Sequence, residues 1–225
     1  MAREGIPFVL VPVFLGLLFG LFQLWPLALL MSAVAAFMIY FFRDPRRVVP
    51  QGEGLIVSAA DGKVTRIDDT DEGKLVSVFL SPLDVHINRS PIAGKINGIT
   101  YLPGKHMAAM SNDASFLNER NSLIIEGDEF TVTCTQIAGI LARRIVCWPR
   151  TGDNLERGQR FGLIKFSSRT DVLMPADAEL SVKIGDRVKG GETVIARMPQ
   201  SQLLVSGPDA GSNLSPIQPA DPVGS

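Results

Sequence analysis

The strongest pattern in the chain is an apolar run near its N-terminus, from residue 6 to residue 42, that contains no charged side chain. As a single helix, this run of about 37 residues would extend roughly 55 Å, well beyond the ~30 Å hydrocarbon core of a bilayer. Pro26 lies near its middle, beside Trp25, a residue type common at membrane interfaces. The pattern therefore predicts two short helices, residues 6–22 and 27–42, that form a transmembrane or a re-entrant hairpin.

Basic residues follow the apolar run, with Arg43, Arg46 and Arg47 directly after it. Positive charges beside membrane helices stay on the cytoplasmic side, and a hairpin returns the chain to the side on which it began. We therefore expect the rest of the chain to lie on the cytoplasmic side of the membrane. A cleaved signal peptide is the alternative, and the small residues at 32–36 would suit it, but signal peptides have a much shorter apolar region.

The pattern changes after residue 47, where short alternating or apolar runs lie between Gly and Asp breaks, as is typical of β-strands. Gly127 and Asp128 separate two such runs as a hairpin turn would. Helical patterns are weak, near residues 107–110 and 140–144. We expect a mainly β or α+β single domain at 48–200, after an anchor at 1–47, and a disordered Pro- and Gly-rich tail at 201–225. The expected strands are 55–59, 64–67, 75–80, 122–126, 130–137, 161–166, 171–174, 179–182 and 193–196.

Composition adds little to this picture, because 22 basic and 23 acidic residues nearly cancel over the 225-residue chain. Two cysteines, Cys134 and Cys147, are too few for a disulfide framework and fit a reducing cytoplasm. The segment 143–169 is locally basic, which fits either a solvated strand face or a surface for anionic headgroups beside a membrane anchor. It lacks the interleaved aromatic platform of nucleic-acid binders, so we expect no nucleic-acid partner.

Three short polar motifs stand out in the β-rich part of the chain. Asp61 precedes a glycine at the end of an apolar run, His86 lies in a dense polar segment, and Ser167 and Ser168 follow an apolar strand. Taken singly, each has an ordinary explanation. Asp-Gly is a common turn pair, a lone histidine is more often structural than catalytic, and two serines after a strand fit a turn.

The ordered set of motifs is more specific than any one of them. This set resembles the short, archaeal and bacterial type of phosphatidylserine decarboxylase, over residues 42–198. The motifs that carry the resemblance are, in order, Phe42-Arg43-Asp44-Pro45, Ala60-Asp61-Gly62-Lys63-Val64, Asp84-Val85-His86-Ile87-Asn88-Arg89-Ser90-Pro91, Asn118-Glu119-Arg120-Asn121, Gln136-Ile137-Ala138-Gly139, and Arg160-Phe161-Gly162-Leu163-Ile164-Lys165-Phe166 with the serine pair.

The resemblance implies a proenzyme, or zymogen, that matures by autocatalytic cleavage between Ser167 and Ser168. The hydroxyl of Ser168 attacks the preceding carbonyl, the ester is eliminated, and hydrolysis leaves a pyruvoyl group. A β chain (1–167) and an α chain (168–225) would then form a heterodimer, with a homo-oligomer left open. The pyruvoyl group would form a Schiff base with phosphatidylserine from the bilayer and take up the electrons released with CO2, giving phosphatidylethanolamine without a metal or pyridoxal phosphate.

The resemblance also implies roles for the other motifs. His86 is the expected base for the Ser168 hydroxyl, with Asp61 orienting its imidazole as in a catalytic triad. Because an unperturbed histidine titrates near neutrality, we also expect His86 to act as the acid that returns a proton to the product. The resemblance does not assign the contacts with the substrate. On charge grounds Arg169, beside the cut, is a candidate, and Arg89 and Asn88 are further candidates.

Two positions depart from the family pattern. Ser167 stands where a glycine usually precedes the cleaved serine, and Arg89 stands where longer members carry a second histidine. A Cβ before the cut restricts the backbone, which leaves open whether maturation is slowed. The first alternative is therefore a homologue that binds lipid but does not process itself.

Two further alternatives concern binding rather than catalysis. Residues 185–194 resemble the hairpin edge of a lipoyl or biotinyl carrier domain, but no lysine lies at the expected upstream turn, where Met174 is followed by Pro175. An anchored β-domain used for assembly is the last alternative, and it would leave Asp61, His86 and the serine pair without an explanation.

Overall fold

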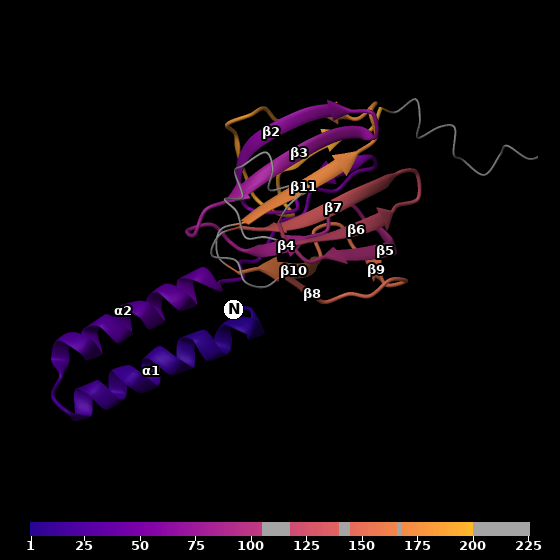
Figure 1. Cartoon of the computed structure of the whole chain (residues 1–225). Coiled ribbons are helices and arrows are strands. Elements are labelled where there is room, and N and C mark those ends of the chain that lie inside the picture. Colours follow the sequence, from indigo (N-terminus) through magenta and orange to yellow (C-terminus); the bar gives the residue numbers. More distant parts are fainter. Residues whose placement is uncertain (105–117, 140–144, 166–167, 200–225) are drawn as a thin grey trace, which may run out of the picture.

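The structure is a computed structural model that describes residues 1–104, 118–139, 145–165 and 168–199. Two helices project from a β-rich body, which is built from a curled eight-stranded sheet and two smaller sheets (Figure 1). The prediction of a mainly β or α+β domain with a helical N-terminus is therefore confirmed. The expected short helices near 107–110 and 140–144 and the expected tail at 201–225 lie outside the described residues.

The apolar run forms two helices, α1 (Ile6–Leu21) and α2 (Trp25–Phe41), preceded by the short 3-10 turn η1 (Arg3–Gly5). Each helix has a proline in its first turn, where the missing N–H costs no hydrogen bond. Gln23 adopts a positive φ of 57° between the helices, which reverses the chain. The two helices lie side by side, and both meet the β-rich body at the same end (Figure 1). The predicted hairpin is confirmed as a pair of helices.

The outer surface of this helix pair is apolar. Leu17, Leu21 and Leu29 are each more than two-thirds exposed, although they are among the most hydrophobic side chains in the chain. The segment Arg3–Leu21 has the length and composition to cross a bilayer, whereas Trp25–Phe41 is two residues shorter. Exposed apolar area of this extent is rare on a protein in water, so the helix pair favours association with a membrane.

The large sheet has the strand order β13-β2-β3-β11-β7-β6-β5-β9, and each neighbouring pair is antiparallel. The two small sheets have the orders β4-β10-β8 and β1-β14-β12. The strands are β1 (Leu55–Val57), β2 (Gly62–Thr70), β3 (Gly73–Leu80), β4 (Ile87–Arg89), β5 (Gly94–Leu102), β6 (Arg120–Glu126), β7 (Thr131–Ala138), β8 (Ile145–Cys147), β9 (Asn154–Leu155), β10 (Arg160–Ile164), β11 (Ser168–Met174), β12 (Glu179–Leu180), β13 (Arg187–Val188) and β14 (Val194–Arg197).

The core fills the inside of the curled sheet with side chains that alternate along the strands. In β6, Leu123 and Ile125 are fully buried while Ile124 between them is 40% exposed, as a period of two requires. Each fully buried aliphatic side chain contributes about 1.5–3 kcal/mol to the stability of the fold. At Gly62 the chain turns with φ +150°, and a Cβ there would lie 2.0 Å from the carbonyl oxygen of Phe79. This glycine therefore allows β2 to approach β3 directly after Asp61.

The strand predictions succeeded where alternation was regular. The hairpin between β6 and β7 is confirmed, with Gly127 donating its N–H to the carbonyl oxygen of Phe130. Strand β5 was missed, because Gly94 and Gly98 interrupt its pattern and most of its side chains face solvent. The short strands β4, β8, β9 and β13 were also missed, because strands of two or three residues are too short to show an alternating pattern.

Candidate active site

Ser168 is the first residue of β11, which lies in the middle of the large sheet. Its backbone pairs with Leu80 at the end of β3 and with Ala138 at the end of β7. Its side chain lies on the same strand face as Val172, a member of the hydrophobic core, and is fully buried. Its Oγ has no hydrogen-bond partner in the described part of the chain. A buried hydroxyl without a partner is costly, so this atom calls for a functional explanation.

Ser167 lies outside the described residues, so the structure does not describe the peptide bond that precedes Ser168. The structure does describe the strands around residue 168, which would be the new N-terminus after a cut. That end would begin within an existing strand, with hydrogen-bonded strands on both sides.

His86 lies between β3 and β4 and is only 3% exposed. Its Nδ1 lies 2.9 Å from the carbonyl oxygen of Asp84. A carbonyl oxygen only accepts hydrogen bonds, so Nδ1 carries the proton and donates it, and Nε2 of the neutral ring holds the free lone pair. Nε2 is buried and has no partner among the described residues. The imidazole is therefore held with its basic atom available.

The titration of His86 differs from the expectation drawn from the sequence. Burial lowers the pKa of its imidazole to about 4, against a smaller opposing effect from the hydrogen bond to Asp84. Phe41, at the end of α2, covers the ring with 4.2 Å between the two ring centroids. The expectation of a pKa near neutrality is wrong, because the ring lies in an apolar environment. At neutral pH His86 is uncharged, which suits a base that must begin without a proton.

The chain brings the segments that carry Ser168 and His86 together at both ends. Leu80, the last residue of β3, pairs with Ser168, and the N–H of Ile164 in β10 donates to the carbonyl oxygen of His86 at 3.3 Å. One segment thus runs from β3 to His86, and the other runs from β10 to Ser168. These two backbone contacts place the two segments beside each other.

Asp61 makes no hydrogen bond with His86 in the part of the chain that the structure describes. Both of its carboxylate oxygens accept hydrogen bonds from Arg47, at 2.9 and 2.7 Å, and one also accepts from the N–H of Gly190 at 2.8 Å. The side chains of Arg47 and Asp61 are only 6% and 15% exposed. The contact that orients the imidazole comes from the backbone of Asp84, so the structure does not form the hydrogen bond that triad logic placed at Asp61.

Each of the three residues expected to contact substrate is held by other protein groups. Arg89 donates to Asp44 at 2.9 Å and to the carbonyl oxygen of Gly158 at 3.0 Å, and burial lowers the pKa of its guanidinium. Arg169 pairs with Asp171 at 2.9 Å within β11, where burial raises the pKa of Asp171. These bonds account for the positions of both arginines, and their contacts with substrate stay predictions.

Asn88, in β4, belongs to a buried polar network that links four strands. It donates to Thr170 Oγ1 in β11 and accepts from Gln136 in β7, both at 2.9 Å, and Gln136 in turn accepts from Asn121 in β6 at 3.1 Å. Thr170 lies two residues after Ser168 on the same strand face. The network therefore fixes the start of β11 against β4 and β7.

Sequence analysis missed two contributors to this site, Phe41 and the backbone of Asp84. The aromatic run Tyr40-Phe41-Phe42 at the end of the apolar segment was the available signal for the first. The Asp84 carboxylate accepts from Ser81 N and Oγ, at 2.8 and 2.6 Å, which forms the turn that presents its carbonyl to His86. The described residues contain no group of three His, Cys, Asp or Glu side chains arranged for a metal ion.

Comparison with known proteins places this site in a family of carboxy-lyases. The phosphatidylserine decarboxylase family matches residues 34–196. A phosphatidylserine decarboxylase proenzyme from Symbiobacterium thermophilum is 49% identical over 89% of this chain and 96% of its own length. Proenzymes of the same name from Geotalea uraniireducens and Desulfotalea psychrophila are 41% and 39% identical, each over 88% of this chain and 97% and 96% of their own lengths. The chain belongs to the phosphatidylserine decarboxylase family.

Proposed function

We propose that the chain is a proenzyme that cuts itself between Ser167 and Ser168 and then decarboxylates phosphatidylserine to phosphatidylethanolamine. The observation that carries the proposal is the pair of buried atoms without a partner in the described structure, Ser168 Oγ and His86 Nε2, on segments joined at both ends. A nucleophile and a base held in this way are the parts that self-cleavage needs. Membership of the family supports the choice of substrate.

In the first step, His86 Nε2 takes the proton from Ser168 Oγ, while its Nδ1–H stays bound to the carbonyl oxygen of Asp84. The oxygen attacks the carbonyl carbon of Ser167, and the peptide bond becomes an ester as the nitrogen of Ser168 takes a proton. Loss of the α-proton of residue 168 then breaks the bond between its Cβ and the ester oxygen. This releases the carboxylate of Ser167 and separates the two chains.

The residues around Ser168 fit the pyruvoyl group that the family uses. Ser168 is fully buried, so water is excluded from the position that the group would occupy. When formed, the group supplies an electron-withdrawing carbonyl that takes up the electron pair released with CO2. The β11 backbone, held by β3 and β7, fixes the position of residue 168. His86, whose pKa burial lowers, gives up a proton readily.

The two chains made by the cut stay together in this proposal. Strand β11 would belong to the chain 168–225, whereas both of its neighbours, β3 and β7, would belong to the chain 1–167. Buried core residues of β11 such as Val172 and Met174 add apolar contacts to these hydrogen bonds. The product is therefore a non-covalent heterodimer.

The proposed site of action is the inner face of the cell membrane. The helix pair would hold the β-rich body against a bilayer that also contains the substrate. Arg43 stacks on Tyr40 at the end of α2, at 3.8 Å from the ring centroid, and Lys165 lies 5.0 Å from the ring centroid of Phe8. Cations and aromatic rings at one level are typical of the headgroup region. The basic residues after α2 support a cytoplasmic position for the domain.

Intact mass tests the cleavage. The fragments 1–167 and 168–225 should have masses of about 18 and about 6 kDa, in proportion to the 24.4 kDa chain. We expect both fragments from the natural chain in detergent micelles, a single uncut chain from Ser168→Ala, and normal cleavage in Ser122→Ala, whose hydroxyl bonds Thr135 on a neighbouring strand.

The second assay measures release of CO2 from phosphatidylserine in mixed micelles. We expect activity only in preparations that contain the cut chain. An uncut natural chain in micelles and in vesicles would overturn the proposal and favour a homologue that binds lipid without processing itself.

A further inference from the structure

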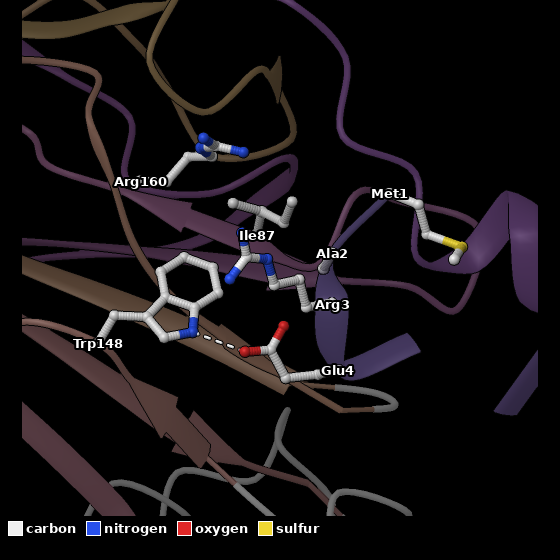
Figure 2. Close-up of a pocket in the computed structure, with 7 residues that line it drawn as sticks. All are labelled: Met1, Ala2, Arg3, Glu4, Ile87, Trp148 and Arg160. Carbon is white, nitrogen blue, oxygen red and sulfur yellow. Dashed lines mark hydrogen bonds between the residues drawn. The ribbon is translucent and has the colours of Figure 1, made fainter. Parts of the chain in front are cut away.

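A cavity of about 440 Å³, whose lining includes neither Ser168 nor His86, lies where the segment before α1 meets the β-rich body. Its walls come from Arg3 and Glu4 of η1, from Ile87 at the start of β4, from Trp148 after β8, and from Arg160 at the start of β10 (Figure 2). Four segments distant in sequence thus form one concave site. The proposed cleavage and decarboxylation use none of these side chains.

Basic groups outnumber acidic ones among the residues that line the cavity. They comprise two guanidinium groups, those of Arg3 and Arg160, and one carboxylate, that of Glu4. This carboxylate accepts a hydrogen bond from Trp148 Nε1 at 2.7 Å, which holds it at the wall beside the indole (Figure 2). Arg160 pairs with Asp44 through one of its nitrogens and is otherwise more than half exposed. The carbonyl oxygen of Arg3 accepts from the N–H of Ile6, whereas its guanidinium makes no hydrogen bond or ion pair with any part of the chain that the structure describes.

The cavity lies at the level where the apolar helices begin. Arg3 is three residues before α1, and the N–H of Ala2 donates to the carbonyl oxygen of Phe42 directly after α2, at 3.0 Å. Lys165 lies over the ring of Phe8, which is in the first turn of α1, so this cation is also close to the start of the helix. If the helices enter a bilayer, the phosphates of the lipid headgroups lie beside the mouth of this cavity.

We propose that this cavity binds a phosphate group, that of an anionic phospholipid headgroup, between Arg3 and Arg160. Guanidinium groups bind phosphate through paired N–H donors, and the net positive charge of the walls selects an anionic headgroup over a zwitterionic one. Trp148 provides a ring of the kind that suits the membrane interface. The site is independent of the proposed decarboxylation, because it needs neither Ser168 nor His86.

Trp148 is also the reporter for the test. The chain has two tryptophans, so Trp25→Phe leaves Trp148 as the single fluorophore. This variant is combined with Ser168→Ala, so that cleavage and turnover do not contribute, and is titrated in maltoside micelles. The ligands are dihexanoyl phosphatidylglycerol, dihexanoyl phosphatidylcholine and inorganic phosphate. We expect a saturable change in Trp148 emission with phosphatidylglycerol, and a response at least about tenfold weaker with phosphatidylcholine.

Variants of Arg3 separate binding in the cavity from general adsorption. Arg3→Gln should weaken the response to phosphatidylglycerol about tenfold, and Arg3→Lys should restore part of it. Arg150→Gln, an exposed arginine two residues from Trp148 and outside the cavity, should leave it unchanged.

The outcomes decide both the site and the source of the phosphate. An equal, Arg3-dependent response to inorganic phosphate would support the phosphate site and assign it to a soluble anion. Equal responses to the two lipids, or no effect of Arg3→Gln, would overturn the proposal. None of these three outcomes affects the test of cleavage at Ser168, which is measured separately by intact mass.

Discussion

The ring of Phe41 lies on the imidazole of His86, with 4.2 Å between their centroids and 35° between their planes. Phe41 is the last residue of α2, and His86 lies between β3 and β4. The helix pair is therefore more than a tether, because its final residue forms part of the environment of the candidate base. Phe41 and its neighbour Phe42 also pack against Val85, Ile87 and Leu163 in a small apolar cluster.

Replacing Phe41 should change the pKa of His86. In Phe41→Leu the ring is lost and water gains access, so we expect the imidazole pKa to rise from about 4 toward 6.5. Titration by NMR in micelles measures this directly, and a second variant, His106→Gln, assigns the signal of the other histidine. Phe37→Leu, one turn earlier in α2, is the matched control and should leave the pKa unchanged. An unaltered pKa in Phe41→Leu would show that other groups bury the ring.

Stability should depend on pH through His86. In the unfolded chain its imidazole takes up a proton below pH 6.5, whereas in the folded chain it does so only near pH 4. The unfolded state thus binds more protons in this window, and stability falls as pH falls from 6.5 to 4, by about 3 kcal/mol from this group. Urea unfolding at several pH values in micelles measures the slope. His86→Gln should lose this part of it, and identical slopes would contradict the low pKa.

Asp61→Asn should act mainly on stability. Removing the carboxylate leaves the buried guanidinium of Arg47 without its principal partner, which costs about 3 kcal/mol. The midpoint of urea unfolding measures this loss, and Asp128→Asn, in the exposed turn between β6 and β7, should show none. We also expect the pH dependence of self-cleavage to keep its shape in Asp61→Asn. A displaced pH profile would instead restore Asp61 as the residue that orients His86.

Asn88→Ala should loosen the start of β11. The change leaves Gln136 Nε2 and Thr170 Oγ1 without the partner that Asn88 supplies, at a cost of about 2 kcal/mol. We expect a lower unfolding midpoint and slower cleavage. Asn97→Ala, which removes an exposed contact with Glu126, is the control and should cost less than about 0.5 kcal/mol. A higher KM for phosphatidylserine with unchanged stability would mean that Asn88 contacts substrate rather than the network.

The sequence by itself determined the parts of this protein that depend on local pattern. The uncharged run with Pro26 in its middle was enough for two helices and a turn, because helix length and chain reversal follow from composition over a few residues. Regular alternation was enough for strands such as β3, β6 and β7. The ordered motifs were enough for the family, since Asp61, His86 and Ser168 occur in a specific order and context.

Only the tertiary structure decided what each of these residues contacts. The carboxylate of Asp61 accepts hydrogen bonds from Arg47 rather than from His86. Phe41 covers the ring of His86, although the two residues are 45 positions apart in the sequence. Burial and ion pairing depend on contacts between distant segments, and a local pattern carries no information about which segments meet. The low pKa of His86 and the cationic cavity around Arg3 both arise in this way. Both the low pKa of His86 and the cavity around Arg3 form only when the helix pair packs against the β-rich body.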